Sequence, residues 1–141
     1  MNDTTAVTID RVFRLSSSYR ALAGRLLARA AELHRAGELD DAAFASVRQS
    51  SDELLVKASD MLVELDDALA QRLAVPLAQI ERATGELKTA GERIAQVTDI
   101  ARAVLGVTAA AAAVAAFVAA PGVPSASAAA EAIAAAVKAL T

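Results

Sequence analysis

The sequence contains no cysteine, which excludes a disulfide framework and any site that depends on a thiolate. It also has no tryptophan, one tyrosine and three phenylalanines, so large rings cannot supply most of a core. Six glycines and three prolines among 141 residues leave little turn chemistry, and the β-branched residues form no alternating run. These absences argue against a strand-rich fold and predict a few long helices.

Residue patterns that would support catalysis are also missing. The only histidine, His34, has no Glu-x-x-His spacing, and no glycine-rich phosphate loop or nucleophile motif occurs. The adjacent acids at 40–41, 52–53 and 66–67 are poor acid–base pairs, because neighbours in a helical sequence do not face each other. We therefore expect no enzyme, no catalytic residue, no metal, no cofactor and no small-molecule substrate.

What the chain has in excess is alanine, concentrated in residues 103–120. These eighteen residues carry no charge, and ten of them are alanine. Alanine is the best helix former, so the segment should be helical, and a helix without a polar side has to be covered by protein or lipid. Gly106 and Ala110 form a small-xxx-small pair that lets a second helix approach closely.

Two coverings of this segment remain open. Its length is at the lower limit for a membrane span of about 20 residues, and its strongly apolar residues favour insertion by only about 2–4 kcal/mol. The alternative is burial in a helical bundle or oligomer. The residues expected to contact membrane or to be buried are Val104, Leu105, Val107, Val114, Phe117 and Val118.

The charges around the segment give an orientation. Arg93 and Arg102 precede it and only Lys138 follows, so the positive-inside rule would leave the N-terminal part cytoplasmic. We expect the two arginines to contact anionic lipid. Residues 1–10 are polar and carry Asp3, unlike a secretory signal, so the expected location is the cytoplasm or the cytoplasmic face of a membrane.

Two amphipathic helices are predicted before residue 76. Apolar residues recur at alternating spacings of three and four over 8–36 and 41–73. Thr8 is the expected cap of the first helix, Gly37 its terminating residue, and Asp40 or Asp41 the cap of the second. A connection this short makes the two helices antiparallel neighbours.

The turn between these helices has a known counterpart. Residues 33–47, with Gly37-Glu38-Leu39-Asp40-Asp41 followed by Phe44, resemble the helix-turn-helix of small SHOCT-type modules. The resemblance implies the turn and no function.

Charge is segregated between the two predicted helices. Residues 8–36 hold six arginines against two acids, while residues 38–71 hold nine acids against Arg48 and Lys57. We therefore expect a basic helix lying beside an acidic one. The net charge of −3 and the scarcity of aromatic residues argue against nucleic acid as a partner.

A third, longer helix is predicted from Pro76 to residue 120. Pro76 either kinks the preceding helix or breaks it, and we favour the break. Gly85 and Gly91 permit either close contact or bending. A heptad pattern along this helix predicts a seam for a partner or for self-assembly, formed by Leu73, Ile80, Leu87, Ile94, Val97 and Val104.

The clearest break follows at Pro121-Gly122-Val123-Pro124-Ser125, after which Ser125 or Ser127 would cap a last helix over 126–140. A helix of that length reaches about 22 Å, short of the roughly 30 Å hydrocarbon core. We expect this second arm to lie on a surface rather than to span.

Together these features predict an all-α protein with two parts. Residues 1–102 form an antiparallel bundle of long amphipathic helices, and residues 103–141 form an alanine-rich apolar hairpin. The expected function is membrane association through the hairpin, with self-assembly or partner binding through the amphipathic helices, as in pore-forming proteins or anchored adapters. The alternative is a soluble coiled-coil scaffold whose hairpin is buried in a homo-oligomer or against a helical partner.

Overall fold

The structure is a computed structural model that describes residues 3–141, and every regular element in that range is a helix. The predicted all-α class is confirmed. The elements are α1 (Asp3–Arg35), α2 (Asp41–Asp60), α3 (Asp67–Ala74), α4 (Leu77–Gly91), the short 3₁₀ helix η1 (Ile94–Gln96), α5 (Ile100–Ala119) and α6 (Val123–Leu140).

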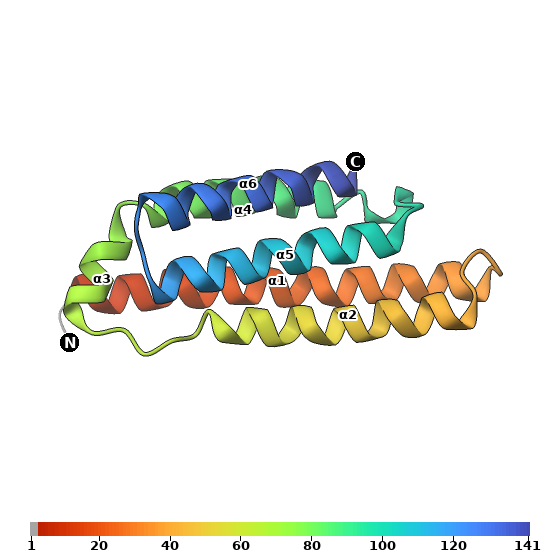
Figure 1. Cartoon of the computed structure of the whole chain (residues 1–141), viewed down its shortest axis with the longest axis horizontal. Coiled ribbons are helices and arrows are strands. Elements are labelled where there is room, and N and C mark those ends of the chain that lie inside the picture. The colour runs from red at the N-terminus through yellow and green to blue at the C-terminus, as the bar shows by residue number, and fades with distance from the viewer. Residues whose placement is uncertain (1–2) are drawn as a thin grey trace.

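The long helices lie side by side with their axes along one direction (Figure 1). In this view α1 and α2 form one side, α4 and α6 the other, and α5 lies between them. α5 packs against α1, α2 and α6, while α6 packs against α4 and α5. The alanine-rich segment is therefore the central helix of the fold.

α1 begins earlier than predicted, at Asp3. Thr8 is a buried residue inside this helix and not its cap, so that expectation is wrong. Thr5 is also buried, and its hydroxyl donates a hydrogen bond to Asp67 at the start of α3. Contact with α3 thus extends the helix over a polar stretch in which apolar periodicity gave no signal.

The predicted turn after α1 is confirmed. Gly37 has a φ of +76°, which favours glycine. Its N–H donates to the carbonyl of His34 at 3.1 Å, and the N–H of Glu38 donates to the carbonyl of Leu33 at 2.9 Å. These two bonds are the Schellman motif. Asp40 then caps α2, because its Oδ1 accepts from the N–H of Ala43 at 2.7 Å.

α1 and α2 are joined by small residues. Ser16 donates to the carbonyl of Ala58 at 2.8 Å, and Ser51 donates to the carbonyl of Ala23 at 3.3 Å. Residue 16 of α1 meets residue 58 of α2, and residue 23 meets residue 51, so the two helices run in opposite directions. The basic and acidic helices do lie together, but among the described residues only His34 and Asp41 form an ion pair between them.

The predicted single helix over 41–73 is wrong. α2 ends at Asp60, residues 61–66 are not helical, and α3 starts after Asp66, whose Oδ1 accepts from the N–H of Leu69 at 2.7 Å. Met61 is fully buried and fixes the start of the connection. At Pro76 the chain breaks between α3 and α4, as we favoured.

The predicted helix from Pro76 to residue 120 is also wrong. α4 ends at Gly91, and α5 starts after Asp99, whose Oδ1 accepts from the N–H of Arg102 at 3.2 Å. A Cβ at Gly91 would lie 2.6 Å from Cδ2 of Leu22, so this glycine permits close contact with α1. A Cβ at Gly85, by contrast, would have no neighbouring atom within 4 Å.

α5 and α6 form a close hairpin. A Cβ at Gly106 would lie 3.3 Å from Cβ of Ala139 and 3.4 Å from Cα of Ala136. α6 begins at Val123, ahead of the predicted start, and Ser125 donates to the carbonyls of residues 120 and 122 instead of capping the helix. The small residue expected to permit close packing thus serves the contact within the hairpin.

The α5–α6 hairpin as the candidate functional site

The apolar side chains of α5 are covered by other helices of the same chain. Five of the six residues expected to contact membrane or to be buried are fully buried, namely Val104, Val107, Val114, Phe117 and Val118. The sixth, Leu105, is 61% exposed. The burial alternative therefore needs no second chain.

One stripe of α5 still faces water. Leu105, Ala109 and Ala116 are exposed along it, so the other described helices of this chain do not cover the whole segment. An exposed alanine presents only a methyl group, which limits the hydrophobic cost of exposure. α6 is exposed along a similar stripe, where Glu131 and Lys138 provide its two charges.

Both arms of the hairpin are long and apolar enough to cross a membrane. α5, with 20 residues, contains an 18-residue window of mean hydropathy 1.9, and the 18 residues of α6 have a mean hydropathy of 1.2. At 1.5 Å per residue these lengths are about 30 Å and about 27 Å. The predicted length of the second arm was too short because α6 starts at Val123. Core helices of water-soluble bundles meet the same criteria.

The hairpin is joined to the rest of the described chain by very few polar bonds. Arg72 donates from Nη2 to the carbonyl of Pro121 at 2.9 Å, and Thr108 donates to the carbonyl of Ser50 at 3.4 Å. The ion pairs of residues 3–141 all lie between positions 10 and 81. Apolar contact is therefore the main attachment of the hairpin.

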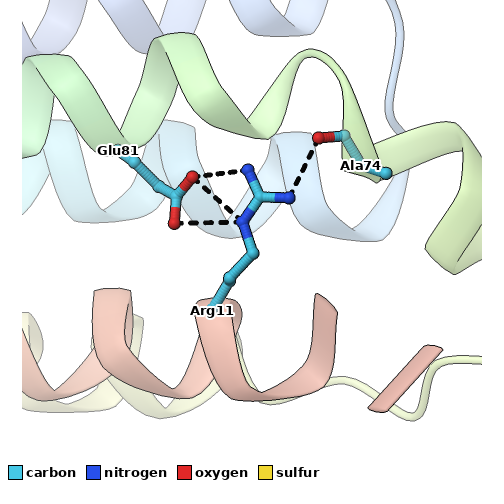
Figure 2. A network of polar contacts seen from close by, with 3 residues as sticks. All are labelled: Arg11, Ala74 and Glu81. Carbon is cyan, nitrogen blue, oxygen red and sulfur yellow. Dashed lines mark hydrogen bonds and ion pairs between the residues drawn. The ribbon is translucent and has the colours of Figure 1, made fainter. Parts of the chain in front are cut away.

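α1 is held to α3 and α4 in a different way. Arg11 donates from Nε to both carboxylate oxygens of Glu81, at 3.0 and 3.1 Å, and from Nη1 to the carbonyl of Ala74 at 3.1 Å (Figure 2). The hydrogen bond with Glu81 raises the pKa of Arg11. Tyr19 is buried with its hydroxyl 3.1 Å from Oγ1 of Thr84, and burial raises the pKa of Tyr19 to about 12.

The two arginines predicted to contact lipid are exposed. Arg93 lies just before η1 and Arg102 near the start of α5, and neither makes an ion pair within residues 3–141. Because Gly106 lies against Ala136 and Ala139, Lys138 is close to the level of Arg102 along the hairpin. Arg102 and Lys138 therefore lie near the open end of the hairpin, away from its turn.

The predicted partner seam is not on one helix. Its residues belong to α3 (Leu73), α4 (Ile80 and Leu87), η1 (Ile94), the segment after it (Val97) and α5 (Val104). Ile94 is partly buried, Val97 is 6% exposed and the others are fully buried. In the folded chain these residues contribute to its own core, and the continuous helix behind the seam prediction is wrong.

Two apolar hollows were missed by sequence reasoning. One of about 460 Å³ is lined by Arg72, Val75, Pro76, Gln79, Pro121, Gly122, Val123, Ala126 and Ser127. Another of about 240 Å³ is lined by Ile9, Val12, Phe13, Leu62, Val63 and Leu65. Each joins segments distant in sequence, so periodicity cannot reveal it. Valines beside prolines, at 75–76 and 123–124, are the only local signal for the first hollow.

His34 takes part in a small contact outside these hollows. Its Nε2 lies 2.7 Å from Oδ1 of Asp41, and its ring stacks on Phe44 with centroids 4.6 Å apart. Residues 3–141 contain no group of three or more histidines and acids that could hold a metal ion.

Comparison with protein families, curated proteins and solved structures gives no match to this chain. The geometry alone therefore carries the functional argument.

Proposed function

We propose that this is a non-catalytic helical protein that associates with a membrane through the α5–α6 hairpin. In water the hairpin stays packed against the other helices in a closed bundle. The observation that carries the proposal is the way the hairpin is attached. Two side-chain hydrogen bonds, from Arg72 and Thr108, and no ion pair join it to the rest of residues 3–141.

Apolar attachment makes lipid a suitable replacement for protein. Burying one large aliphatic or aromatic side chain contributes about 1.5–3 kcal/mol, so exposing the buried residues of α5 to water would cost on the order of 10 kcal/mol. Hydrocarbon offers them an apolar environment again. The hairpin should therefore stay closed in water and open only at a membrane.

The remaining helices have polar bonds of their own. α1 is bonded to α2 through Ser16 and Ser51, and to α4 through Arg11 and Tyr19. None of these bonds involves α5 or α6. The α1–α4 part can therefore keep its internal contacts while the hairpin changes partners.

Charges limit how deeply each arm enters. A charged side chain at the bilayer centre costs about 3 kcal/mol, which favours keeping Glu131 and Lys138 of α6 in the interfacial layer. α5 has no charge after Arg102 and is the arm that enters hydrocarbon. Arg93 and Arg102 then remain at the level of the headgroups, where anionic lipid attracts them.

The decisive variant is Ala109→Lys. Ala109 is exposed in the closed bundle and central in α5, so the charge is tolerated in water and opposed in hydrocarbon. We expect flotation with zwitterionic vesicles to show binding by the native chain and roughly 100-fold weaker binding by Ala109→Lys, since about 3 kcal/mol corresponds to that factor.

The matched control is Ala45→Lys, which adds the same charge at an exposed alanine of α2. It should bind vesicles like the native chain, and both variants should keep the native thermal unfolding midpoint. A native chain that never floats, or two variants that float equally well, would contradict the proposal.

A second candidate is a soluble adapter or scaffold that stays closed and binds a copy of itself or a helical partner. The observation in its favour is Phe13, which is 56% exposed at the hollow it shares with Leu62. Light scattering tests it. The control is Val56→Ser, at an equally exposed residue of α2. If Phe13→Ser abolishes assembly and Val56→Ser does not, the result supports this candidate over membrane association.

A further inference from the structure

The larger of the two apolar hollows described above lies where the corner between α3 and α4 meets the turn between α5 and α6. Its lining comes from residues 72–79 on one side and 121–127 on the other. Its volume of about 460 Å³ falls within the range of about 300–1,000 Å³ found for small-molecule sites. The size admits a ligand of several carbon atoms.

The walls of this hollow are mainly apolar and unusually exposed. Val75 is 83% exposed and Val123 is 80% exposed, the highest values among the large hydrophobic side chains of residues 3–141. Both line this hollow, together with Pro76, Pro121 and Ala126. A hydrocarbon chain lying there would remove both valines from water.

One charge stands in this apolar lining. Among residues 3–141, Arg72 is the only charged residue that lines the hollow. Its bond to the carbonyl of Pro121, at 2.9 Å from Nη2, orients the guanidinium. The other N–H groups of Arg72 make no hydrogen bond within residues 3–141 and stay available. Gln79 and Ser127 add neutral polar groups to the lining.

We propose that this hollow binds a free single-chain amphiphile with one anionic head, of the medium-chain fatty acid class. The carboxylate pairs with Arg72 and the chain lies on Val75 and Val123. One guanidinium matches one negative charge. A cationic head would be repelled, and an uncharged ligand would leave the positive charge of Arg72 without a negative partner. The site is complete in the closed bundle, so it does not depend on membrane association.

The test is a titration of this chain with decanoate, at concentrations at which the decanoate is monomeric. Amide NMR spectra monitor binding, and decanol serves as the uncharged probe. Saturable shifts are expected at residues 72–79 and 121–127. Arg72→Gln removes the charge and keeps a polar side chain. It should weaken decanoate binding about tenfold or more, as loss of a charge-assisted hydrogen bond predicts, with little change for decanol.

Two matched controls separate the head from the chain. Arg82→Gln removes an exposed arginine of α4 outside the hollow and should bind decanoate normally. Val75→Ser should weaken both probes, whereas Val56→Ser should weaken neither. All four variants should unfold near the native midpoint, because the substituted side chains are exposed.

Shifts that do not saturate, shifts centred on another surface, or equal effects of Arg72→Gln and Arg82→Gln would overturn the inference. A separate arm uses zwitterionic vesicles without decanoate. A chain that binds decanoate but no vesicles keeps this site and overturns the proposed membrane function, and the opposite result overturns only the site.

Discussion

The α1–α4 part and the α5–α6 hairpin are both helical and both well buried, yet they are held by different forces. α1 makes side-chain hydrogen bonds to α2, α3 and α4, including the charged pair of Arg11 and Glu81. The hairpin has two such bonds to the rest of the described chain and otherwise depends on apolar contact.

This difference determines which part of the molecule can exchange its surroundings. Hydrogen bonds need a partner at a defined distance and angle, so α1 and its neighbours have one arrangement. The hydrophobic effect is not directional, so the hairpin can be covered by helices of this chain, by another protein or by lipid. Substitutions in each part and a change of pH distinguish the two kinds of attachment.

Truncating Phe117 tests the apolar attachment. Phe117 is fully buried in α5, and we expect Phe117→Ala to lower the free energy of unfolding by about 3–5 kcal/mol. Phe13→Ala, at a residue that is 56% exposed, should lower it by less than about 1 kcal/mol. Urea unfolding measures both, and similar losses would mean that the hairpin core is not the main source of stability.

Alkaline pH tests the polar side of the comparison. The pKa of Tyr19 is about 12 in the folded chain and about 10 when unfolded. The unfolded chain therefore loses this proton first as pH rises. The contribution of neutral Tyr19 to the free energy of unfolding is complete below pH 10. It is lost between pH 10 and 12, and the loss amounts to about 2–3 kcal/mol.

Tyr19→Phe removes this titration. Urea unfolding between pH 8 and 12 should show a shallower alkaline loss of stability in Tyr19→Phe than in the native chain. Identical pH profiles would mean that the tyrosine hydroxyl is not held protonated in the core.

Two glycines give the smallest effects, with opposite signs. Gly106→Leu should lower the free energy of unfolding by about 1–3 kcal/mol through overpacking, because a Cβ added at this position would lie 3.3 Å from Cβ of Ala139. Gly85→Ala should stabilise by about 0.5–1 kcal/mol, since that position in α4 has open space. Thermal unfolding of the two variants checks the signs, and a tolerated leucine at 106 would contradict the close hairpin.

Local signals in the sequence were sufficient for much of the fold. The all-α class followed from alanine content and helical periodicity, and the turn at Gly37 from a residue type whose backbone preference is local. A cap at Asp40 or Asp41 and a break at Pro76 are equally local signals. Of the six positions named for membrane contact or burial, all but Leu105 are buried in this fold, and the sequence left the choice between the two coverings open.

The interruptions after Asp60 and Gly91 were not predictable in the same way. Apolar spacing continues through 61–73 and 92–104, since Met61, Leu73 and Val97 still have to be buried. The spacing of apolar residues indicates which side chains are buried. The same spacing is compatible with several short helices and with one long helix, so it does not locate the interruptions. The hollow around Arg72 was missed because its two halves are about fifty positions apart in sequence, and only tertiary packing joins them.

The serine and alanine contacts between α1 and α2 have a consequence for alignment. Ser16 meets Ala58 and Ala23 meets Ser51, so the donors are seven residues from the acceptors on each helix. Sliding the helices by seven residues in one direction would set Ala23 opposite Phe44, and in the other direction it would set Ser16 opposite a position beyond the end of α2 at Asp60. In either case both serines lose the alanine carbonyls that they bond, so these two bonds form together in only one alignment of α1 and α2.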